Sequence, residues 1–285
     1  LVDDCWTDLI GNIADMYRRG AIQPEMDLPE VLEMANFEKM ESIRKRVEES
    51  VDNPEIAEAL KPWYALFCKR PCFDDEYLPT FNRENVDLID TGGLGVEKIT
   101  PNGVVVAGQE YEVDCIIFAT GFEVGTGYER RAGCQVVGAD GRTLTEKWDE
   151  NGVSTLHGLQ TSGYPNYFIL SANQGAFTVN FPHLLEEAAT NAVCIIKHII
   201  DEGYSTVDVE QEAEDEWVKT IIEKARGPIG AGPGSTECTP GYYNNEGHLN
   251  EKARQGAPYG GGSVEFFKLM EDWRDNGDFK GLEFK

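Results

Sequence analysis

The sequence predicts an α/β fold in which the first 66 residues are helical and short strands fill the middle of the chain. Apolar residues recur at helical spacing over residues 1–20 and again from about 29 to 47. After Arg70 the pattern changes to short β-branched runs separated by turn residues. A long amphipathic helix is predicted at about 182–202. A chain of 285 residues can bury a sizeable core, as one large domain or two ordinary ones.

The N-terminal region is predicted to be a series of helices. Asn53-Pro54 ends the second helix, and Asn53 can cap a short helix that follows through Leu60, because an asparagine side chain accepts hydrogen bonds from a first helical turn. Glu41 and Lys45 stand four residues apart, a spacing that favours an ion pair on one helix face. This region carries no recognisable chemistry.

Strands are predicted mainly between Arg70 and the long helix. Pro101-Asn102-Gly103 is a strong hairpin turn between two β-branched runs. The apolar run from Cys115 to Phe118 predicts a buried strand that leads into Ala119-Thr120-Gly121-Phe122. The predicted strands cover residues 86–90, 96–100, 104–106, 113–118, 167–170 and 282–284.

The C-terminal part is predicted to alternate helices with one long loop. Helices are expected at about 182–202, 210–225 and 263–275. The loop at 227–247 is rich in glycine and proline and contains Tyr242-Tyr243-Asn244-Asn245. The apolar stripe of the first helix comprises Leu184, Leu185, Ala188, Ala192, Ile195, Ile196 and Ile199.

The composition is strongly acidic, with a formal net charge of -26 at pH 7. Because nucleic-acid binding depends on basic surfaces, nucleic acid is not expected as a main partner. An anionic ligand would need a local basic site. No apolar run approaches the length of about 18 residues that indicates a membrane span, so no membrane partner is expected.

The cysteines indicate the cellular compartment of the protein, and the first residues indicate whether the chain is part of a longer one. The seven cysteines form no C-x-x-C pair, and the four histidines share no metal-ligand spacing with them. We therefore expect neither a metal site nor a disulfide framework, and a reducing cytoplasm as the location. The chain begins at Leu1, directly in a helical pattern, and we expect it to be the back part of a longer polypeptide.

Two adjacent cations, Lys69 and Arg70, are the main candidate site. Pro71 disfavours the helical conformation at the residue before it, so the pair is expected in an extended segment or loop. In an acidic chain, two fixed cations beside apolar residues suggest that they hold an anion. The alternative is an ordinary basic pair on the surface.

The glycine clusters do not match a dinucleotide-binding turn. Gly92-Gly93-Leu94-Gly95 follows a predicted strand, but the β-branched run after it replaces the helix whose N-terminus would hold a pyrophosphate. Residues 230–234 contain Pro233 and follow no strand. The sequence thus contains no complete G-x-G-x-x-G unit.

Weaker candidates have equally good structural explanations. His183 opens the long helix and is either a polar helix start or a ligand contact. Cys68 and Cys72 flank the basic pair. They are either reactive thiols, whose pKa the neighbouring positive charge lowers, or inert thiols. The aromatic and amide run at Tyr242 is either a ligand clamp or an anchor for its loop.

Several short motifs are spread along the chain. They are Phe67-Cys68-Lys69-Arg70-Pro71, Asp75-Glu76-Tyr77-Leu78, Thr80-Phe81-Asn82-Arg83, Asn85-Val86, residues 114–122, Glu146-Lys147-Trp148, Gly163-Tyr164-Pro165-Asn166 and Tyr259-Gly260-Gly261. Together these motifs resemble those of the Baeyer–Villiger monooxygenases, flavoprotein oxidoreductases that use FAD and NADPH, and the resemblance extends over essentially the whole chain. Ala119-Thr120-Gly121-Phe122 by itself would indicate only the wider class of flavoproteins with two dinucleotide-binding domains.

The resemblance implies two Rossmann-like dinucleotide-binding domains, of which this chain holds only the C-terminal parts. The glycine motifs of the family lie in the N-terminal half and are missing here. The implied division is a helical insertion of the NADP domain at 1–66, the C-terminal part of that domain at 67–112, and the C-terminal part of the FAD domain at 113–285.

The resemblance also implies roles for individual residues. Arg70 matches the family's catalytic arginine, whose charge stabilises negative oxygen during the reaction. Lys69 matches a neighbour that contacts NADP, where it can pair with the 2′-phosphate that distinguishes NADPH from NADH. Tyr242 stands where close relatives carry a tryptophan that reaches the nicotinamide cofactor. Positions near the flavin are Leu184, with His183 as the neighbouring candidate, and Thr120, Gly121 and Phe122.

The implied function is the insertion of one oxygen atom of O₂ beside a ketone carbonyl, giving an ester or lactone. The chain alone is expected to be inactive. Its expected partners are the N-terminal half of the same polypeptide, the ketone substrate and O₂. One alternative is a flavin-containing monooxygenase that oxidises nitrogen or sulfur. A non-enzymatic alternative is a truncated interaction module.

Overall fold

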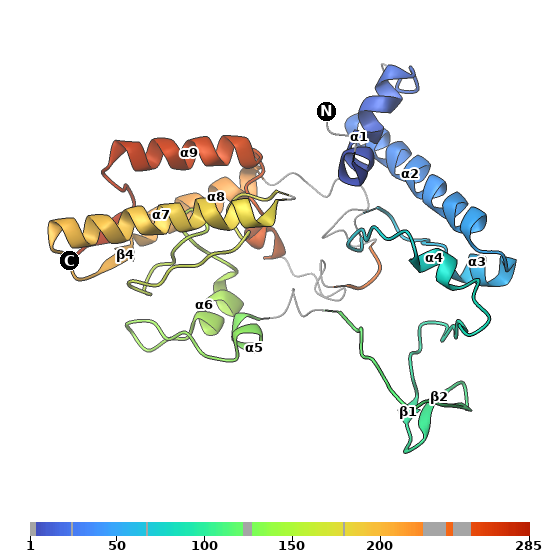
Figure 1. Ribbon diagram of the computed structural model, residues 1–285. Helices are drawn as coiled ribbons and strands as arrows, with labels where there is room; N and C mark the ends of the chain where they lie inside the picture. The colour runs from blue at the N-terminus through green and yellow to red at the C-terminus, as the bar shows by residue number, and fades with distance from the viewer. Residues whose placement is uncertain are drawn as a thin grey trace. The chain divides into compact units, whose positions relative to one another are not determined.

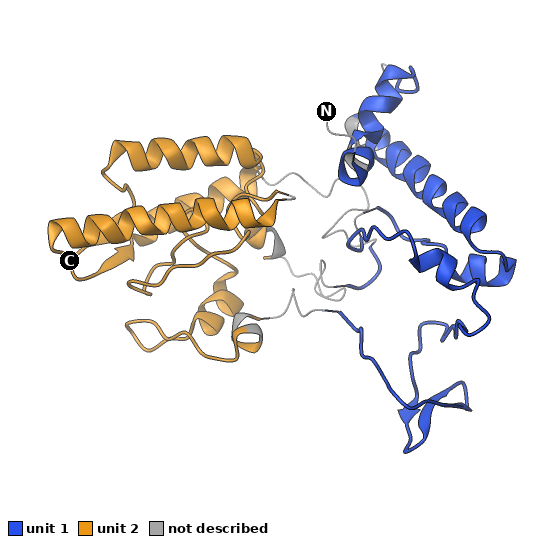
Figure 2. Ribbon diagram, in the orientation of Figure 1, with its two compact units in different colours: residues 1–124, 228–247 blue, residues 125–227, 248–285 orange. Residues whose placement is uncertain are grey.

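The structure is a computed structural model that describes residues 4–23, 25–66, 68–121, 127–178, 180–224, 238–241 and 252–285. The chain divides into two compact units, Leu1–Val124 with Pro228–Gly247, and Gly125–Gly227 with His248–Lys285 (Figure 2). Each unit is described by itself below. Together they mix helices with short antiparallel strands, which agrees with the predicted α/β class at that level.

The first unit begins with a pair of packed helices, α1 (Cys5–Arg18) and α2 (Leu28–Ser50) (Figure 1). α2 starts with a capping box, in which Asp27 accepts from the backbone N–H of Glu30 and Glu30 accepts from that of Asp27. Met16 is fully buried, and Asn12 of α1 donates to the carbonyl of Ala35 at 2.7 Å. The two predicted N-terminal helices are therefore confirmed.

The short helix α3 (Pro54–Leu60) is confirmed together with its cap, because Asn53 Oδ1 accepts from the N–H groups of Glu55 and Ile56. The predicted pair between Glu41 and Lys45 is wrong. Arg44 pairs with Glu41 at 2.7 Å and Lys45 with Glu49 at 3.7 Å. Arg44 is held near Glu41 because its guanidinium also donates to the carbonyl of Pro62 and lies over the ring of Trp63. A short unpredicted helix, α4 (Tyr77–Thr80), follows the basic pair.

A three-stranded antiparallel meander completes the first unit. β1 (Lys98–Ile99) pairs with β2 (Gly103–Val106) in the predicted hairpin, with Lys98 opposite Val105. β3 (Gln109–Glu112), which the sequence did not predict, pairs with β2 through a turn in which Ala107 and Gly108 both have positive φ. A side chain at Gly103 would lie 1.9 Å from the carbonyl oxygen of Tyr111, so this approach of β2 to β3 requires glycine.

Three predicted strands do not form, at residues 86–90, 113–118 and 167–170. Within the described residues, no other segment pairs with them as a strand, and strand backbones need such a partner for their hydrogen bonds. The side chains of Ile117 and Phe118, predicted to be buried, are 85% and 72% exposed. Ile169 is buried and its N–H donates to the carbonyl of Leu159, so this last segment packs without strand geometry.

The second unit is built on three longer helices, α7 (Phe181–Glu202), α8 (Gln211–Lys224) and α9 (Ser263–Asn276), all predicted (Figure 1). The predicted C-terminal strand β5 (Leu282–Phe284) is confirmed, and it pairs antiparallel with the unpredicted β4 (Val207–Val209). The smaller elements are α5 (Tyr128–Ala132), α6 (Leu144–Asn151) and the 3₁₀ helix η2 (Ala253–Gly256). None of the described helices is long and apolar enough to span a membrane.

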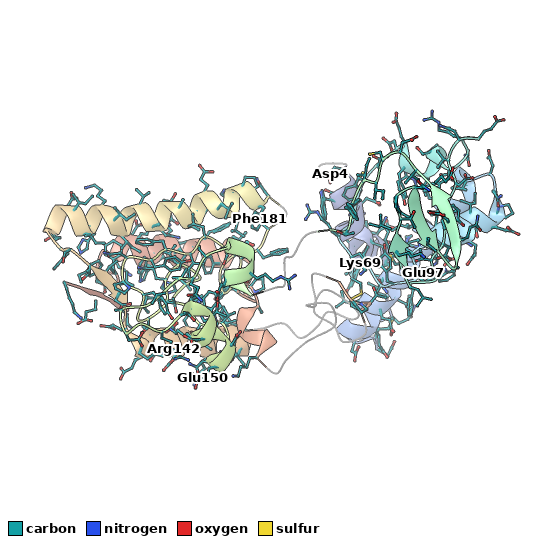
Figure 3. The ribbon with its side chains drawn as sticks, turned by 90° about the horizontal axis from the view of Figure 1, so that it is seen from below. Asp4, Lys69, Glu97, Arg142, Glu150 and Phe181 are labelled. Atoms are coloured by element: carbon teal, nitrogen blue, oxygen red, sulfur yellow. A yellow bond between two sulfur atoms is a disulfide. The ribbon has the colours of Figure 1, made fainter. Side chains whose placement is uncertain are left out.

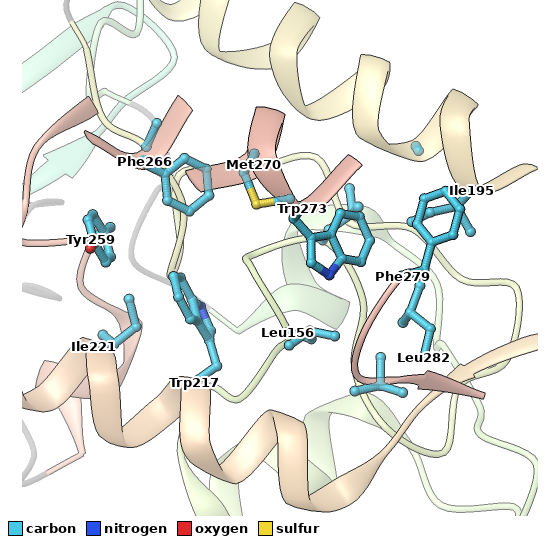
Figure 4. Packing of buried hydrophobic residues seen from close by; sticks show 14 of the residues in the cluster. Leu156, Ile195, Trp217, Ile221, Tyr259, Phe266, Met270, Trp273, Phe279 and Leu282 are labelled. Carbon is cyan, nitrogen blue, oxygen red and sulfur yellow. The ribbon is translucent and has the colours of Figure 1, made fainter. Parts of the chain in front are cut away.

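Aromatic side chains fill the core of the second unit (Figure 4). Trp217 of α8 stacks on Tyr259 with ring centres 5.6 Å apart. The ring of His157 contacts Trp217 and Trp273 edge-on, with ring centres at 4.8 and 5.2 Å. The core thus joins α8, α9 and the loops before α7 into one packed body.

A buried ion pair joins α6 to α8. Nζ of Lys147 lies 3.0 and 2.9 Å from the two carboxylate oxygens of Glu214, and both residues are buried. The ammonium also donates to Thr161 Oγ1 and to the carbonyl of Ser162, each at 2.8 Å. The three N–H groups of Lys147 therefore have partners, which is the condition under which a buried charge is tolerated.

Replacement of Glu214 by glutamine should destabilise the protein by about 3–5 kcal/mol, because it leaves the buried charge of Lys147 uncompensated. Urea unfolding measures this change. Glu216→Gln, an exposed change on the same helix, is the control and should cost less than about 0.5 kcal/mol. The double variant Lys147→Met/Glu214→Leu should recover much of the loss. Wild-type stability of Glu214→Gln would contradict the interpretation.

His157 should make the second unit sensitive to acid. Burial lowers the pKa of His157 from 6.5 to about 4, so the folded state favours the neutral imidazole. Stability is then fully present above pH 6.5 and is lost as the pH falls towards 4, by at most about 3 kcal/mol.

Hydrogen–deuterium exchange of α8 and α9 at pH 7 and pH 5 measures this sensitivity. His157→Asn should reduce it, since asparagine tolerates the positive φ of 57° at this position. His183→Gln, which changes an exposed histidine of the same unit, should leave the pH dependence as in wild type. Equal acid sensitivity of the wild type and of His157→Asn would remove His157 as the cause.

Candidate functional site

The basic pair lies in an irregular segment of the first unit, between α3 and α4. Neither Lys69 nor Arg70 is in a helix or strand, which confirms the prediction from Pro71. Lys69 is half-buried and Arg70 is exposed. The backbone here is therefore fixed by tertiary contacts rather than by regular secondary structure.

A disulfide holds this segment to a distant part of the chain. Cys68 is bonded to Cys238, 170 residues later in the sequence, with a Cα–Cα distance of 5.3 Å, and both residues are buried. The expectation that the chain has no disulfide is therefore wrong for Cys68 and Cys238. The other five cysteines are free thiols. Cys68 is thus no candidate for a reactive thiol, and the exposed Cys72 donates to the carbonyl of Arg70 at 3.7 Å.

The side chain of Lys69, which Figure 3 labels, lies against the segment that follows Cys238. Its Nζ donates to the backbone carbonyl of Pro240. A side chain at Gly241 would lie 2.9 Å from this Nζ and 3.6 Å from Cδ, so the lysine stem passes directly over that glycine. We refer to Cys238–Gly241 as the clasp segment.

The electrostatic state of the two cations differs from that of most bases in the chain. Among the described residues Lys69 donates to a neutral carbonyl and to no carboxylate, so two of its three N–H groups have no acceptor there. Within the described residues, no carboxylate forms an ion pair with the guanidinium of Arg70, although Arg19, Arg44, Arg46 and Arg142 all have such partners. The pair therefore keeps its positive charge, as an anion site requires.

The remaining predicted site residues of the first unit are only partly described. Thr120 and Gly121 are exposed and irregular, and Gly121 has a φ of +95° that favours glycine. Phe122 and Tyr242 lie outside the described residues. Tyr242 directly follows Gly241 in the sequence.

The predicted residues of the second unit occupy the first turn of α7. The N-cap Asn180 accepts from the N–H of His183 at 3.3 Å. The ring of His183 is exposed and contacts Phe267 of α9, with ring centres 5.2 Å apart. Leu184 is buried in the core and lines a small cavity together with His157 and Phe266. The structure thus brings Lys69 and Arg70 together in one unit and His183 and Leu184 in the other.

Sequence reasoning missed the clasp segment. Pro240 acts through a backbone carbonyl, which leaves no mark in a side-chain pattern, and Gly241 stood among many glycines of the loop. The odd number of cysteines gave no means of pairing Cys68 with Cys238. No group of three or more potential metal-binding side chains occurs in the part of the chain that the structure describes.

Comparisons with known proteins identify related sequences. No family model matches the chain. Neopentalenolactone D synthase of Streptomyces avermitilis is 44% identical over 288 residues, which cover 100% of this chain and 48% of that protein. Baeyer–Villiger monooxygenase 4 of a Dietzia species is 40% identical over 290 residues, covering 100% of this chain and 46% of that protein.

Solved structures of monooxygenases are similar as well. The polycyclic ketone monooxygenase of the fungus Thermothelomyces thermophila matches with a TM-score of 0.80 and 31% identity, over 100% of this chain and 43% of that one. The complex of OTEMO with FAD and NADP matches with a TM-score of 0.70 and 26% identity, over 88% of this chain and 45% of that one.

These relatives agree with the resemblance carried by the basic pair and the other motifs. The two curated sequences match the full extent of this chain at 44% and 40% identity, and the two solved structures match over 100% and 88% of it. The chain therefore belongs to the Baeyer–Villiger monooxygenase family and spans about half the length of the curated relatives it matches.

Proposed function

We propose that this chain is the C-terminal half of an FAD- and NADPH-dependent monooxygenase that inserts one oxygen atom of O₂ beside a ketone carbonyl, giving an ester or lactone. The pair Lys69 and Arg70 is the observation that carries the proposal, because it keeps its positive charge within a strongly acidic chain. The names of the relatives support the same reaction class.

NADPH fits the basic pair. Its 2′-phosphate is an anion, and the two N–H groups of Lys69 that Pro240 leaves open can donate to it. A lysine ammonium suits this role because it is a compact point charge that binds phosphate without fixed geometry. Lys69 would therefore select NADPH over NADH.

Arg70 is the proposed catalytic residue. Its guanidinium is exposed and can meet negative oxygen as charge develops during transfer to the ketone. Electrostatic stabilisation of this kind is often the largest contribution that a side chain makes to a reaction rate.

FAD supplies the activation of O₂ when it is bound. The chain contains no G-x-G-x-x-G unit, so its own residues do not fit the flavin pyrophosphate. Gly121, with its positive φ, would allow close approach of a ligand to the backbone beside Thr120 and Phe122. We propose that Thr120, Gly121 and Phe122 contact the flavin, together with His183 and Leu184. Tyr242 is the proposed contact to the nicotinamide cofactor.

The proposed partner is the N-terminal half of the same polypeptide. The apolar segment 113–118 is exposed and lacks strand partners among the described residues, although its pattern is that of a buried strand. α7 carries a second apolar face, formed by Val193, Ile196 and Ile200 at helical spacing, and Val193 and Ile200 are 62% and 71% exposed. Covering both surfaces would complete the two Rossmann-like domains.

The proposed division within the whole enzyme is a helical insertion at 1–66, the end of the NADP domain at 67–112 and the end of the FAD domain at 113–285. The expectation of a reducing cytoplasm rested on the absence of a disulfide, and the Cys68–Cys238 bond removes that basis. The separate chain should be inactive, because it cannot hold the flavin pyrophosphate.

Arg70→Ala in the full-length protein should lower the rate of ester formation by about 10² to 10³, because the developing negative oxygen loses its cation. Gas chromatography of the product from a ketone panel measures this rate, and flavin absorbance confirms that FAD remains bound. Arg46→Ala removes another exposed arginine of the same unit and should leave the rate unchanged. Near wild-type oxygenation by Arg70→Ala would remove its catalytic role.

Lys69→Met in the full-length protein should raise the KM for NADPH about tenfold or more and leave the KM for NADH unchanged, because the lost contact is to the 2′-phosphate. Steady-state kinetics with both cofactors measures the effect. Lys45→Met, an exposed lysine of α2, is the matched control. Equal changes with NADPH and NADH would assign Lys69 to a different part of the cofactor.

A further inference from the structure

The clasp segment makes three separate contacts with Cys68 and Lys69. Cys238 is covalently bound to Cys68, the residue directly before Lys69. Pro240 accepts from Nζ of Lys69, and Gly241 lies under the lysine stem. Each contact limits a different part of the lysine: its backbone, its terminal ammonium and its methylene chain.

These contacts restrict a side chain that is flexible by nature. Lysine has four rotatable side-chain bonds, and holding such a side chain in one geometry has an entropic cost on binding. A lysine that is already held in place has less freedom to lose when it meets a ligand. The disulfide supports this by removing relative motion between two segments that are far apart in sequence.

We propose that Cys238 and Gly241 are positioning residues for NADPH: through the disulfide to Cys68 and the Pro240 carbonyl, the clasp segment holds the Lys69 ammonium ready for the 2′-phosphate. This inference rests on the function proposed above. Reduction by a dithiol breaks the S–S bond, moves two electrons and two protons to the cysteines and leaves the reductant as a disulfide. The two thiols then no longer tie the clasp segment to Cys68, the residue before Lys69.

A purely structural cross-link would have different consequences. Loss of the disulfide would then lower stability and change kcat and the KM for both cofactors alike. A positioning role concerns only the part of the cofactor that Lys69 meets, so it changes the KM for NADPH and leaves NADH unaffected. The comparison of the two cofactors therefore separates the explanations.

The experiment measures steady-state kinetics of the full-length enzyme with NADPH and NADH, before and after reduction with dithiothreitol. We expect reduction, and the Cys68→Ser/Cys238→Ser variant, to raise the KM for NADPH about fivefold, with kcat and the KM for NADH unchanged. The control Cys5→Ser removes an exposed free thiol of the same unit and should behave as wild type in both states. Peptide mapping after alkylation reports whether Cys68 and Cys238 are bonded.

Gly241→Ala provides a second variant that keeps the disulfide. Its added methyl group would come within 2.9 Å of Nζ, and the flexible end of Lys69 can move away at little cost to the fold. We expect the same rise in the KM for NADPH alone. This variant keeps the proposal testable if the cysteine variant does not fold.

Two results would overturn the inference. In the first, the KM for NADPH is unchanged both by reduction and by Gly241→Ala, although Lys69→Met loses its preference for NADPH. That result would leave the proposed function intact. The other is alkylation of both Cys68 and Cys238 in the unreduced enzyme. Failure of the proposed function itself has a different signature, namely a wild-type enzyme that neither oxidises NADPH nor forms an ester.

Discussion

Backbone hydrogen bonding is the constraint on which this structure depends. Helices satisfy their N–H and C=O groups within one segment, and a hairpin does so with its immediate neighbour. α2, α7 and the β1–β2–β3 meander therefore form from nearby residues. Residues 113–118 have the apolar character of a central strand, yet their backbone needs partners on both sides. Within the described residues they have none, and their side chains are exposed.

The family motifs separate into two physical kinds. Glu146 closes the capping box of α6 with Thr143, Lys147 forms the buried ion pair with Glu214, and Trp148 donates to the carbonyl of Ser154. In the second unit, Asn166 likewise ties its loop to β4 by accepting from the N–H of Val207. These residues stabilise the fold. Lys69 and Arg70 have no comparable structural partner among the described carboxylates, which is why the pair carries the functional proposal.

The elements that sequence could predict are those whose signals are local. Asn53 marks its helix because its cap lies two and three residues away, and Pro101-Asn102-Gly103 marks its hairpin in the same way. Among the residues that the structure describes, β4 pairs with the distant β5 alone, so its three residues carried no sufficient local pattern. For the site, the type and position of Lys69 were readable from sequence. The disulfide and the Pro240 carbonyl were not, because they depend on a chain segment about 170 residues away.

The partner of Lys69 also explains how an acidic protein can keep a usable cation. In this chain, lysines such as Lys61, Lys197 and Lys268 pair with carboxylates, and such a pair has no net charge to offer an anion. A carbonyl also holds an ammonium by a hydrogen bond, but it brings no negative charge of its own. The contact with Pro240 therefore gives Lys69 a partner without neutralising it.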